Sequence, residues 1–451
     1  MKKMFLTLCL ITLLLGCEDL VDTEYPSNQI GRVQVFEDIQ TANAALAGLY
    51  ASLRDRYVLK TNYGLGPLLD SYTDNLKCFL DDQNGVMDIY NDSPQATNST
   101  IKTVWNNAYE EIYYANSIIY GADHSTKLSQ EEKDGIIGEA LFVRSLVYFY
   151  LQQVFGDIPY TTSLDYEYNK DLNKTESNKV LEQLELDISK AIDLLSNEYR
   201  DAERIHPNKK VAELLLAKLY LTEHKYELAQ QKLTNILQSS LYQFQDDINE
   251  VFHKSGNHIL WQLKPANNGD PTQEAAFYYF TDSAPNSYVL THDLIEVFDD
   301  NDLRKQSYME KVVFKDNSWY RPNKYKNRKN NNSEYSIVFR LAEVNSLMAE
   351  ALAGQNNFNE ALPYLNETRV RAGLTPILSL SGEGFVNELL NEKRREFFTE
   401  FGQRFLDLKR FNRLDQLKGL KPNWTTNNKL WPLPQAELLL NSNLGPQNEG
   451  Y

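Results

Sequence analysis

The sequence predicts a mostly α-helical fold in which paired helices form a single-domain scaffold for irregular, loop-rich segments. Along most of the chain, apolar residues recur at intervals of three and four, the period of a helix buried on one face. Stretches near residues 77–100 and 258–335 lack this period and are rich in Asn, Asp and Pro. With 451 residues and 42% hydrophobic composition, the chain can bury a core without a metal or a disulfide.

The N-terminus has the layout of a secreted, lipid-anchored protein. Lys2 and Lys3 precede an apolar run that is too short to span a bilayer. Leu14-Leu15-Gly16-Cys17 resembles the bacterial lipobox, in which cleavage before the cysteine frees it for acylation. We therefore expect a signal peptide at 1–16, lipidation of Cys17, and a tether over 17–36 that holds the protein to a membrane. The alternative is an ordinary signal peptide in which Cys17 is incidental.

Charge and cysteine content exclude several classes of protein. The formal charge is −16, and it becomes −18 when Lys2 and Lys3 leave with the signal peptide. A surface this acidic repels nucleic acid and anionic lipid headgroups, so we expect no nucleic-acid partner. Cys78 is the one cysteine left after Cys9 is removed and Cys17 is acylated, so no disulfide framework is predicted. The 28 tyrosines and 20 phenylalanines supply many aromatic ring faces for packing or for ligand contact.

Helices are predicted first at 41–57, 104–120 and 135–156. In the first of them, Ala45, Leu49 and Leu53 lie on one stripe. The third is expected to end at Gly156, because a glycine followed closely by a proline is a usual stop signal.

Two later segments repeat one pattern. Residues 217–229 and 349–361 both place an alanine, an aromatic residue nine positions on, and another alanine three further. This spacing is typical of a tetratricopeptide hairpin, in which alanines let two helices approach and the aromatic ring fills the space between them. The repeat supports a helical-repeat core, although two unrelated hairpins could share the spacing by chance.

Five motifs, in order along the chain, resemble one family. They are GEALFVRSLVYFYLQQVFGDIPY (138–160), FRLAEVNSLMAEAL (339–352), NETRVRAGL (366–374), EKRREFFTEFGQRFLDLKR (392–410) and LWPLPQAELLLNSNLGPQNEGY (430–451). Together they are similar to the SusD/RagB lipoproteins, over nearly the whole chain. Two positions depart from the family pattern: Phe401 replaces a glycine, and Ser442 replaces the proline after Asn441.

The resemblance implies a fold, a function and a partner. It implies tetratricopeptide-like helix pairs beneath irregular binding segments, within a domain spanning 37–451. It also implies an outer-membrane lipoprotein on the cell exterior, which binds an oligosaccharide or polysaccharide and delivers it to a SusC-type TonB-dependent transporter. Some members bind peptides instead, and that alternative stays open. The family performs no chemistry on its ligand, so no catalytic residue, cofactor or metal is expected.

Aromatic residues in the irregular stretches are the candidates for ligand contact. A sugar ring stacks its C–H face on an aromatic plane, while neighbouring amides and charges bind its hydroxyls. Three consecutive rings in a loop bounded by Pro and Asn cannot all point inward. By contrast, we expect Trp105, Trp261 and Trp431 to be packing residues. The binding candidates are Tyr90, Tyr278, Tyr279, Phe280, Trp319 and Tyr320.

Charged residues suggest an enzyme only weakly. Glu396 and Glu400 lie four apart, and Glu400 is expected to pair with Arg404 on one helix. Arg369 and Arg371 are expected to pair with acidic groups at helix contacts. A glycoside hydrolase, which requires two carboxylates at a set separation, remains an alternative without a local motif. The six histidines lack metal-ligand spacing. FDDNDLR at 298–304 lacks the glycine and the glutamate of a calcium loop, so a solvated loop is expected there.

Overall fold

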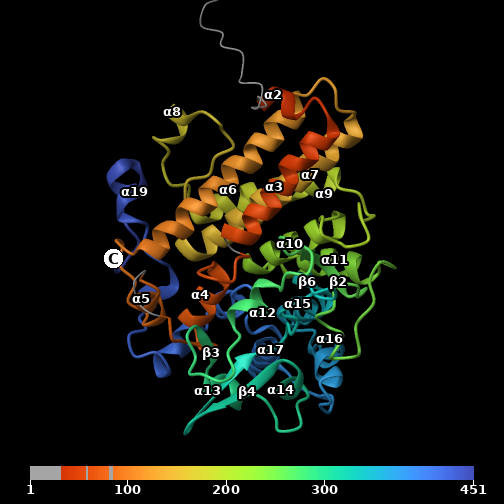
Figure 1. Cartoon of the computed structure of the whole chain (residues 1–451), viewed down its shortest axis with the longest axis vertical. Coiled ribbons are helices and arrows are strands. Elements are labelled where there is room, and N and C mark those ends of the chain that lie inside the picture. Colours follow the sequence, from red (N-terminus) through yellow and green to blue (C-terminus); the bar gives the residue numbers. More distant parts are fainter. Residues whose placement is uncertain (1–31, 57–58, 81–84) are drawn as a thin grey trace, which may run out of the picture.

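The computed structural model describes residues 32–56, 59–80 and 85–451 (Figure 1). The predicted signal peptide, Cys17 and most of the tether lie outside these residues. The last part of the predicted tether forms helix α2 (Arg32–Val35), and Phe36 after it is buried. Residues 32–36 therefore belong to the folded unit. No helix within the described ranges has the length and apolar content needed to cross a bilayer.

Long helices from the N-terminal half form the upper layer of the molecule in Figure 1. The three helices predicted first are confirmed. Asn98 caps the second of them by accepting hydrogen bonds from two backbone N–H groups, and a capping box of Ser129 and Glu132 starts the third. That helix ends at Gly156, whose φ of 77° favours glycine. The layer consists of α3 (Ile39–Arg56), α6 (Ser99–His124), α7 (Gln130–Phe155) and α9 (Ser177–Leu194).

The two repeated segments adopt the same hairpin. They form α10 (Lys209–Thr222) with α11 (Tyr226–Leu237), and α15 (Leu341–Gly354) with α16 (Phe358–Arg371). The turn residue is left-handed in both, with φ 57° at His224 and 64° at Asn356, seven positions after the first alanine. All four pattern alanines are fully buried. The structure therefore confirms tetratricopeptide-like pairing.

Two small antiparallel sheets occupy the irregular stretches. One has the strand order β1-β3-β5-β4, and the other pairs β2 with β6. The prediction that Trp319 and Tyr320 lie in a loop is wrong, because both lie on β5, which forms a hairpin with β4. The strands are β1 (Leu76–Cys78), β2 (Ile259–Leu263), β3 (Tyr288–Leu290), β4 (Met309–Phe314), β5 (Asn317–Pro322) and β6 (Ser336–Arg340).

The C-terminal segment returns to the long helices. The backbone N–H of Trp431 donates to the carbonyl of Val154 at 2.9 Å, and the fully buried Trp431 ring packs against Tyr72 and Phe155. Trp105 and Trp261 are buried as well, so all three predicted packing roles are confirmed. This part contains α17 (Gly382–Phe397), α18 (Gln403–Arg410), η2 (Leu414–Gly419), η3 (Thr426–Lys429), α19 (Gln435–Leu440) and η4 (Ser442–Leu444).

Short helices complete the chain between these elements. They lie mainly in the irregular stretches and at the turns between the long helices. They are α4 (Leu65–Tyr72), α5 (Val86–Tyr90), α8 (Tyr166–Asn169), α12 (Gln273–Phe277), α13 (His292–Glu296) and α14 (Arg304–Ser307).

A buried ion-pair network joins α14, the end of β6, α16 and α17. The Glu396 carboxylate contacts the guanidinium groups of Arg304, Arg340 and Arg371, and all four side chains are at most 1% exposed. Arg369 pairs with Glu388 at 2.6 Å. The predicted pairing of the two arginines of α16 is therefore confirmed.

One other charge prediction is wrong. Glu400 pairs with Lys324 and Arg340 rather than with Arg404, which binds Asp74 instead. The reason is that α17 ends at Phe397, and positive φ angles follow at Thr399, Phe401 and Gly402, so no single helix face carries the predicted pair.

The predicted solvated loop at 298–304 is also wrong in part. Asp302 and Arg304 form a fully buried pair with a 2.8 Å contact. Asp299 and Asp300 of the same segment are exposed, as expected.

Candidate ligand-binding sites

Three of the predicted binding residues meet on one face of the four-stranded sheet. Phe280 packs edge-on against Trp319 of β5, with ring centroids 6.5 Å apart. Phe79, Val289 and Val312 complete this small apolar cluster, which is separate from the main core. Trp319 is half-buried, whereas Phe280 is 5% exposed and has no free ring face. Of this pair, the structure leaves only Trp319 accessible to a ligand.

Tyr279 extends the cluster with charged neighbours. The guanidinium carbon of Arg328 lies 3.4 Å from its ring centroid, and that of Arg321 lies 4.6 Å away. Trp319 and Arg321 are two residues apart on β5 and so share one face of the strand. Tyr279 and Trp319, both half-buried, together with Arg321 and Arg328, form what we call the sheet strip.

Electrostatics make the sheet strip locally cationic. Arg321 is buried and donates to the Glu310 carboxylate at 2.5 Å, but its Nε has no acceptor among the described residues. Burial lowers the pKa of Arg321, and the adjacent Arg328 charge lowers it further. Because Arg328 stacks on the Tyr279 ring itself, a ligand at the sheet strip meets guanidinium donors next to aromatic rings, an arrangement suited to polar ligands.

The other three predicted residues lie elsewhere. Tyr278 is 2% exposed and belongs to the main core. The expectation that the three consecutive rings would not all point inward is met only by Tyr279, because Tyr278 and Phe280 are both buried. Tyr320, next to Trp319 on β5, packs against the main core. Tyr90 ends α5, where the Lys421 ammonium lies 4.3 Å from its ring centroid.

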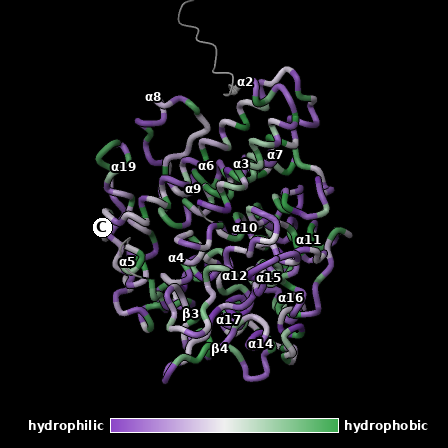
Figure 2. Tube along the Cα trace, viewed as in Figure 1, coloured by the Kyte–Doolittle hydropathy of each residue, from purple (hydrophilic) through white to green (hydrophobic). Residues whose placement is uncertain are grey.

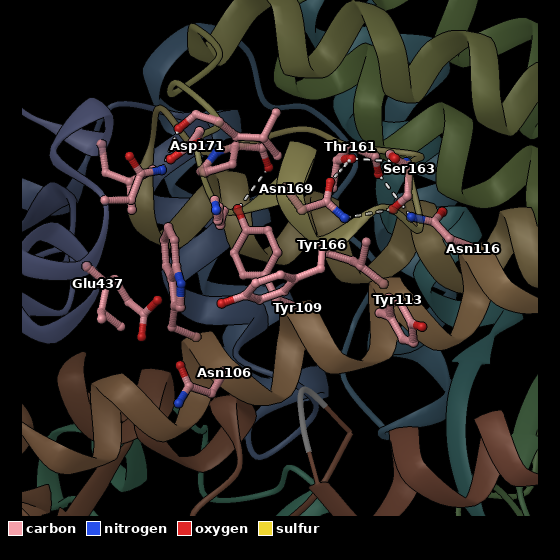
Figure 3. Close-up of a pocket in the computed structure, with 18 of the residues that line it drawn as sticks. Asn106, Tyr109, Tyr113, Asn116, Thr161, Ser163, Tyr166, Asn169, Asp171 and Glu437 are labelled. Atoms are coloured by element: carbon pink, nitrogen blue, oxygen red, sulfur yellow. Dashed lines mark hydrogen bonds between the residues drawn. The ribbon is translucent and has the colours of Figure 1, made fainter. Parts of the chain in front are cut away.

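A pocket of about 780 Å³ lies far from the sheet, beside α6, α8 and α19 (Figures 1 and 3). This volume is within the range of about 300–1,000 Å³ usual for small-ligand sites. Four aromatic residues, four asparagines and several leucines line it. The lining residues are Trp105, Asn106, Tyr109, Ile112, Tyr113, Asn116, Pro159, Thr161, Ser163, Leu164, Tyr166, Asn169, Lys170, Asp171, Leu172, Glu437, Leu440, Asn441 and Leu444.

Hydrogen bonds hold the pocket wall formed by residues 159–172. Thr161 Oγ1 donates to Asn169 Oδ1 at 2.7 Å, and Asn169 Nδ2 donates to the carbonyl of Ser163 at 2.9 Å (Figure 3). Asn116 of α6 donates to the carbonyl of Thr161 at 3.2 Å. At the other end of the wall, Asn441 donates to the carbonyl of Leu172 at 2.8 Å. These hydrogen bonds therefore fix the shape of the pocket wall.

Sequence reasoning missed this pocket. Trp105, Tyr109 and Tyr113 follow one another at intervals of four on the predicted helix 104–120, and that spacing indicated one face. From the sequence, only Trp105 of this face is predicted to be a packing residue, and Tyr109 and Tyr113 are assigned no role. No local pattern links it to Tyr166 or Glu437, which come from distant parts of the sequence.

Metal ligation has no support in the described ranges. Within them, no three His, Cys, Asp or Glu side chains cluster closely enough to hold an ion. Both candidate sites are built from aromatic, amide and charged groups suited to binding.

Comparison with known proteins decides the family. Residues 23–221 match a SusD-like family model described as starch-binding and associating with the outer membrane, and residues 262–451 match the SusD family model. The chain belongs to the SusD/RagB family. Two SusD-like proteins of Formosa agariphila align along the chain: P25 is 24% identical, with 97% of each chain covered, and P2 is 26% identical, with 100% covered.

Solved structures of the family share the fold. A SusD superfamily protein from Bacteroides vulgatus matches with a TM-score of 0.78 and 21% identity, covering 92% of this chain and 100% of its own. A laminarin-binding SusD-like protein also matches with a TM-score of 0.78, at 20% identity, covering 91% of this chain and 99% of its own. The helix-pair scaffold predicted from the sequence is thus the scaffold of the family.

Proposed function

We propose that this SusD/RagB protein captures an oligosaccharide or polysaccharide at the sheet strip. The observation that carries the proposal is the grouping of two half-buried aromatic rings, Tyr279 and Trp319, with the two guanidinium groups that lie against Tyr279. Aromatic faces stack on the C–H faces of sugars, and guanidinium donors bind their hydroxyl or acidic groups. The laminarin binding named for a structural neighbour supports a glycan ligand. Tyr90, near the C-terminal segment, would be at most a peripheral contact.

The protein would act from a membrane anchor and without catalysis. Acylation at Cys17 would hold it to the outer membrane on the cell exterior, since two or more acyl chains anchor a protein far more firmly than one. The bound glycan would pass to a SusC-type TonB-dependent transporter. Support comes from the lipobox-like Leu14–Cys17 sequence and from the family description, which names outer-membrane association.

Replacing both Tyr279 and Trp319 with alanine is expected to reduce retardation strongly in a polysaccharide affinity gel. The double substitution removes both accessible rings of the sheet strip while leaving the helix pairs intact. Stacking on one aromatic ring is worth about 0.5–1.5 kcal/mol, so removing both rings should weaken binding by about 5- to 140-fold. The panel would include laminarin, starch and acidic polysaccharides.

The matched control is Tyr120→Ala, which removes a 49% exposed tyrosine from α6 outside both sites. This variant should migrate like the unaltered protein. Unchanged retardation of the double variant would refute the sheet strip as the glycan site. Binding of a peptide mixture, with no retardation by any glycan, would favour the peptide alternative.

A further inference from the structure

We infer that the pocket between α6, α8 and α19 is a second binding site, which takes a short neutral oligosaccharide. The inference rests on the glycan binding proposed above and adds a separate site with its own ligand class. In Figure 1 the pocket elements lie at the upper left and the sheet lies at the lower end, so one short oligosaccharide cannot contact both.

The pocket offers ring surfaces from two walls. Tyr109 and Tyr113 project from α6, while Tyr166 projects from α8 and is 74% exposed (Figure 3). Leu440, 82% exposed, comes from α19, which is a hydrophobic segment at the edge of the molecule in Figure 2. Exposed apolar side chains gathered around a cavity mark a binding site.

Polar groups at the pocket are available to hydroxyl groups. Within the described part of the chain, the side chains of Asn106, Asp171 and Glu437 form no hydrogen bond or ion pair, although all three line the pocket. Amide and carboxylate groups beside aromatic planes suit a polyhydroxylated ring. A purely apolar ligand would gain nothing from these groups.

Charge selects for a neutral ligand. Lys170, the one cation among the lining residues, pairs with Glu167 next to the pocket. Asp171 and Glu437 keep their negative charges unpaired among the described residues. An anionic sugar would therefore meet net repulsion here, unlike at the sheet strip with its two arginines.

A peptide fits the pocket less well. Peptides bound in extended form pair with the free edge of a strand. The lining residues come from helices and irregular segments, and the carbonyls of Thr161, Ser163 and Leu172 already accept hydrogen bonds from asparagines.

The test uses fluorine NMR of residues 18–451, the chain without the predicted signal peptide and the predicted lipidation site Cys17, labelled with 5-fluorotryptophan. Of the five tryptophans, Trp105 lines the pocket and Trp319 lies in the sheet strip, so each site has its own reporter. The probes are hexasaccharides of β-1,3-glucan, α-1,4-glucan, xylan and mannan, with an oligogalacturonate hexamer as the acidic probe. Resonances are assigned by single Trp→Phe substitutions.

We expect a neutral hexasaccharide to shift the Trp105 resonance saturably and the acidic hexamer to leave it unchanged. Tyr166→Ala should weaken the affinity read from Trp105 by about three- to tenfold. The matched control is Tyr168→Ala, which removes a 60% exposed tyrosine from the same short helix but does not line the pocket. This control should leave the affinity unchanged.

Each other outcome overturns a specific claim. If Trp319 responds and Trp105 does not respond to any neutral probe, the second site is wrong and the proposed function stands. A response of Trp105 alone supports the pocket and refutes the sheet strip. An equal response of Trp105 to the acidic hexamer, or equal effects of the two tyrosine variants, refutes the neutral site.

Discussion

Replacing Glu396 with glutamine is expected to lower the free energy of unfolding by about 3–5 kcal/mol. The Glu396 carboxylate lies 2.6 Å from Arg340 and 3.2 Å from Arg304, and it also contacts Arg371. Burial raises the pKa of Glu396, but the three guanidinium charges outweigh burial and hold the pKa well below its usual range. Glutamine would leave three buried cations with one negative charge fewer.

Equilibrium unfolding in urea measures this loss. The matched control is Glu182→Gln, which breaks an exposed pair with Lys179 at 2.8 Å. Exposed pairs contribute about 0–1 kcal/mol, so the control should unfold at nearly the same urea concentration as the unaltered protein. A loss below 1 kcal/mol in the Glu396 variant would show that the network does not stabilise the scaffold.

Acid is expected to unfold the protein steeply between about pH 4 and pH 2. Burial raises the pKa of Glu350, Glu392 and Asp74, but nearby cations outweigh burial and lower each pKa to about 2. The cations are Arg410 and Lys393 for Glu350, Arg304 and Arg395 for Glu392, and Arg404 and Arg394 for Asp74.

The direction of this pH dependence follows from the protons that the chain takes up when it unfolds. In the unfolded chain these carboxyls return to ordinary pKa values of 3.8 for Asp and 4.5 for Glu, so their stabilisation is complete above those values. It is lost as the pH falls toward 2, because the unfolded state then binds more protons. Each group changes the free energy of unfolding by up to about 1.4 kcal/mol per pH unit. Together the three groups give a slope of up to about 4 kcal/mol per pH unit. Unfolding free energies measured in urea at pH 5, 4 and 3 check this, and equal values would contradict it.

The scaffold was predictable because its signals are local. The helical period, the stop signal at Gly156 and the alanine–aromatic spacing each depend on neighbouring residues. The two repeats even share a left-handed turn residue, His224 in one and Asn356 in the other. The pairing of Arg369 and Arg371 also followed from their place at a helix contact.

The errors arose where the backbone leaves a regular element. Glu400 and Arg404 fit an i,i+4 pair only if the helix continues, and the left-handed residues after Phe397 end it. The assignment of Trp319 to a loop failed because β5 pairs with strands whose short sequences carry no clear alternation.

The binding sites were less predictable than the scaffold. Aromatic residues in irregular stretches directed attention to the region of Tyr279 and Trp319, and that assignment stays a prediction. The burial of Tyr278 could not be foreseen, because it depends on packing across the fold. The pocket could not be predicted from the sequence, because Tyr109, Tyr166 and Glu437 come together only through tertiary contacts between segments far apart in the chain.

The most direct test of glycan capture is isothermal titration of the mature chain with the polysaccharide that most retards it in the affinity gel. The same mixture is then analysed by size-exclusion chromatography and for new reducing ends. We predict saturable binding that leaves the polymer at its original length. Shortening of the polymer would contradict the account and favour a glycoside hydrolase, and the absence of any heat of binding would refute glycan capture itself.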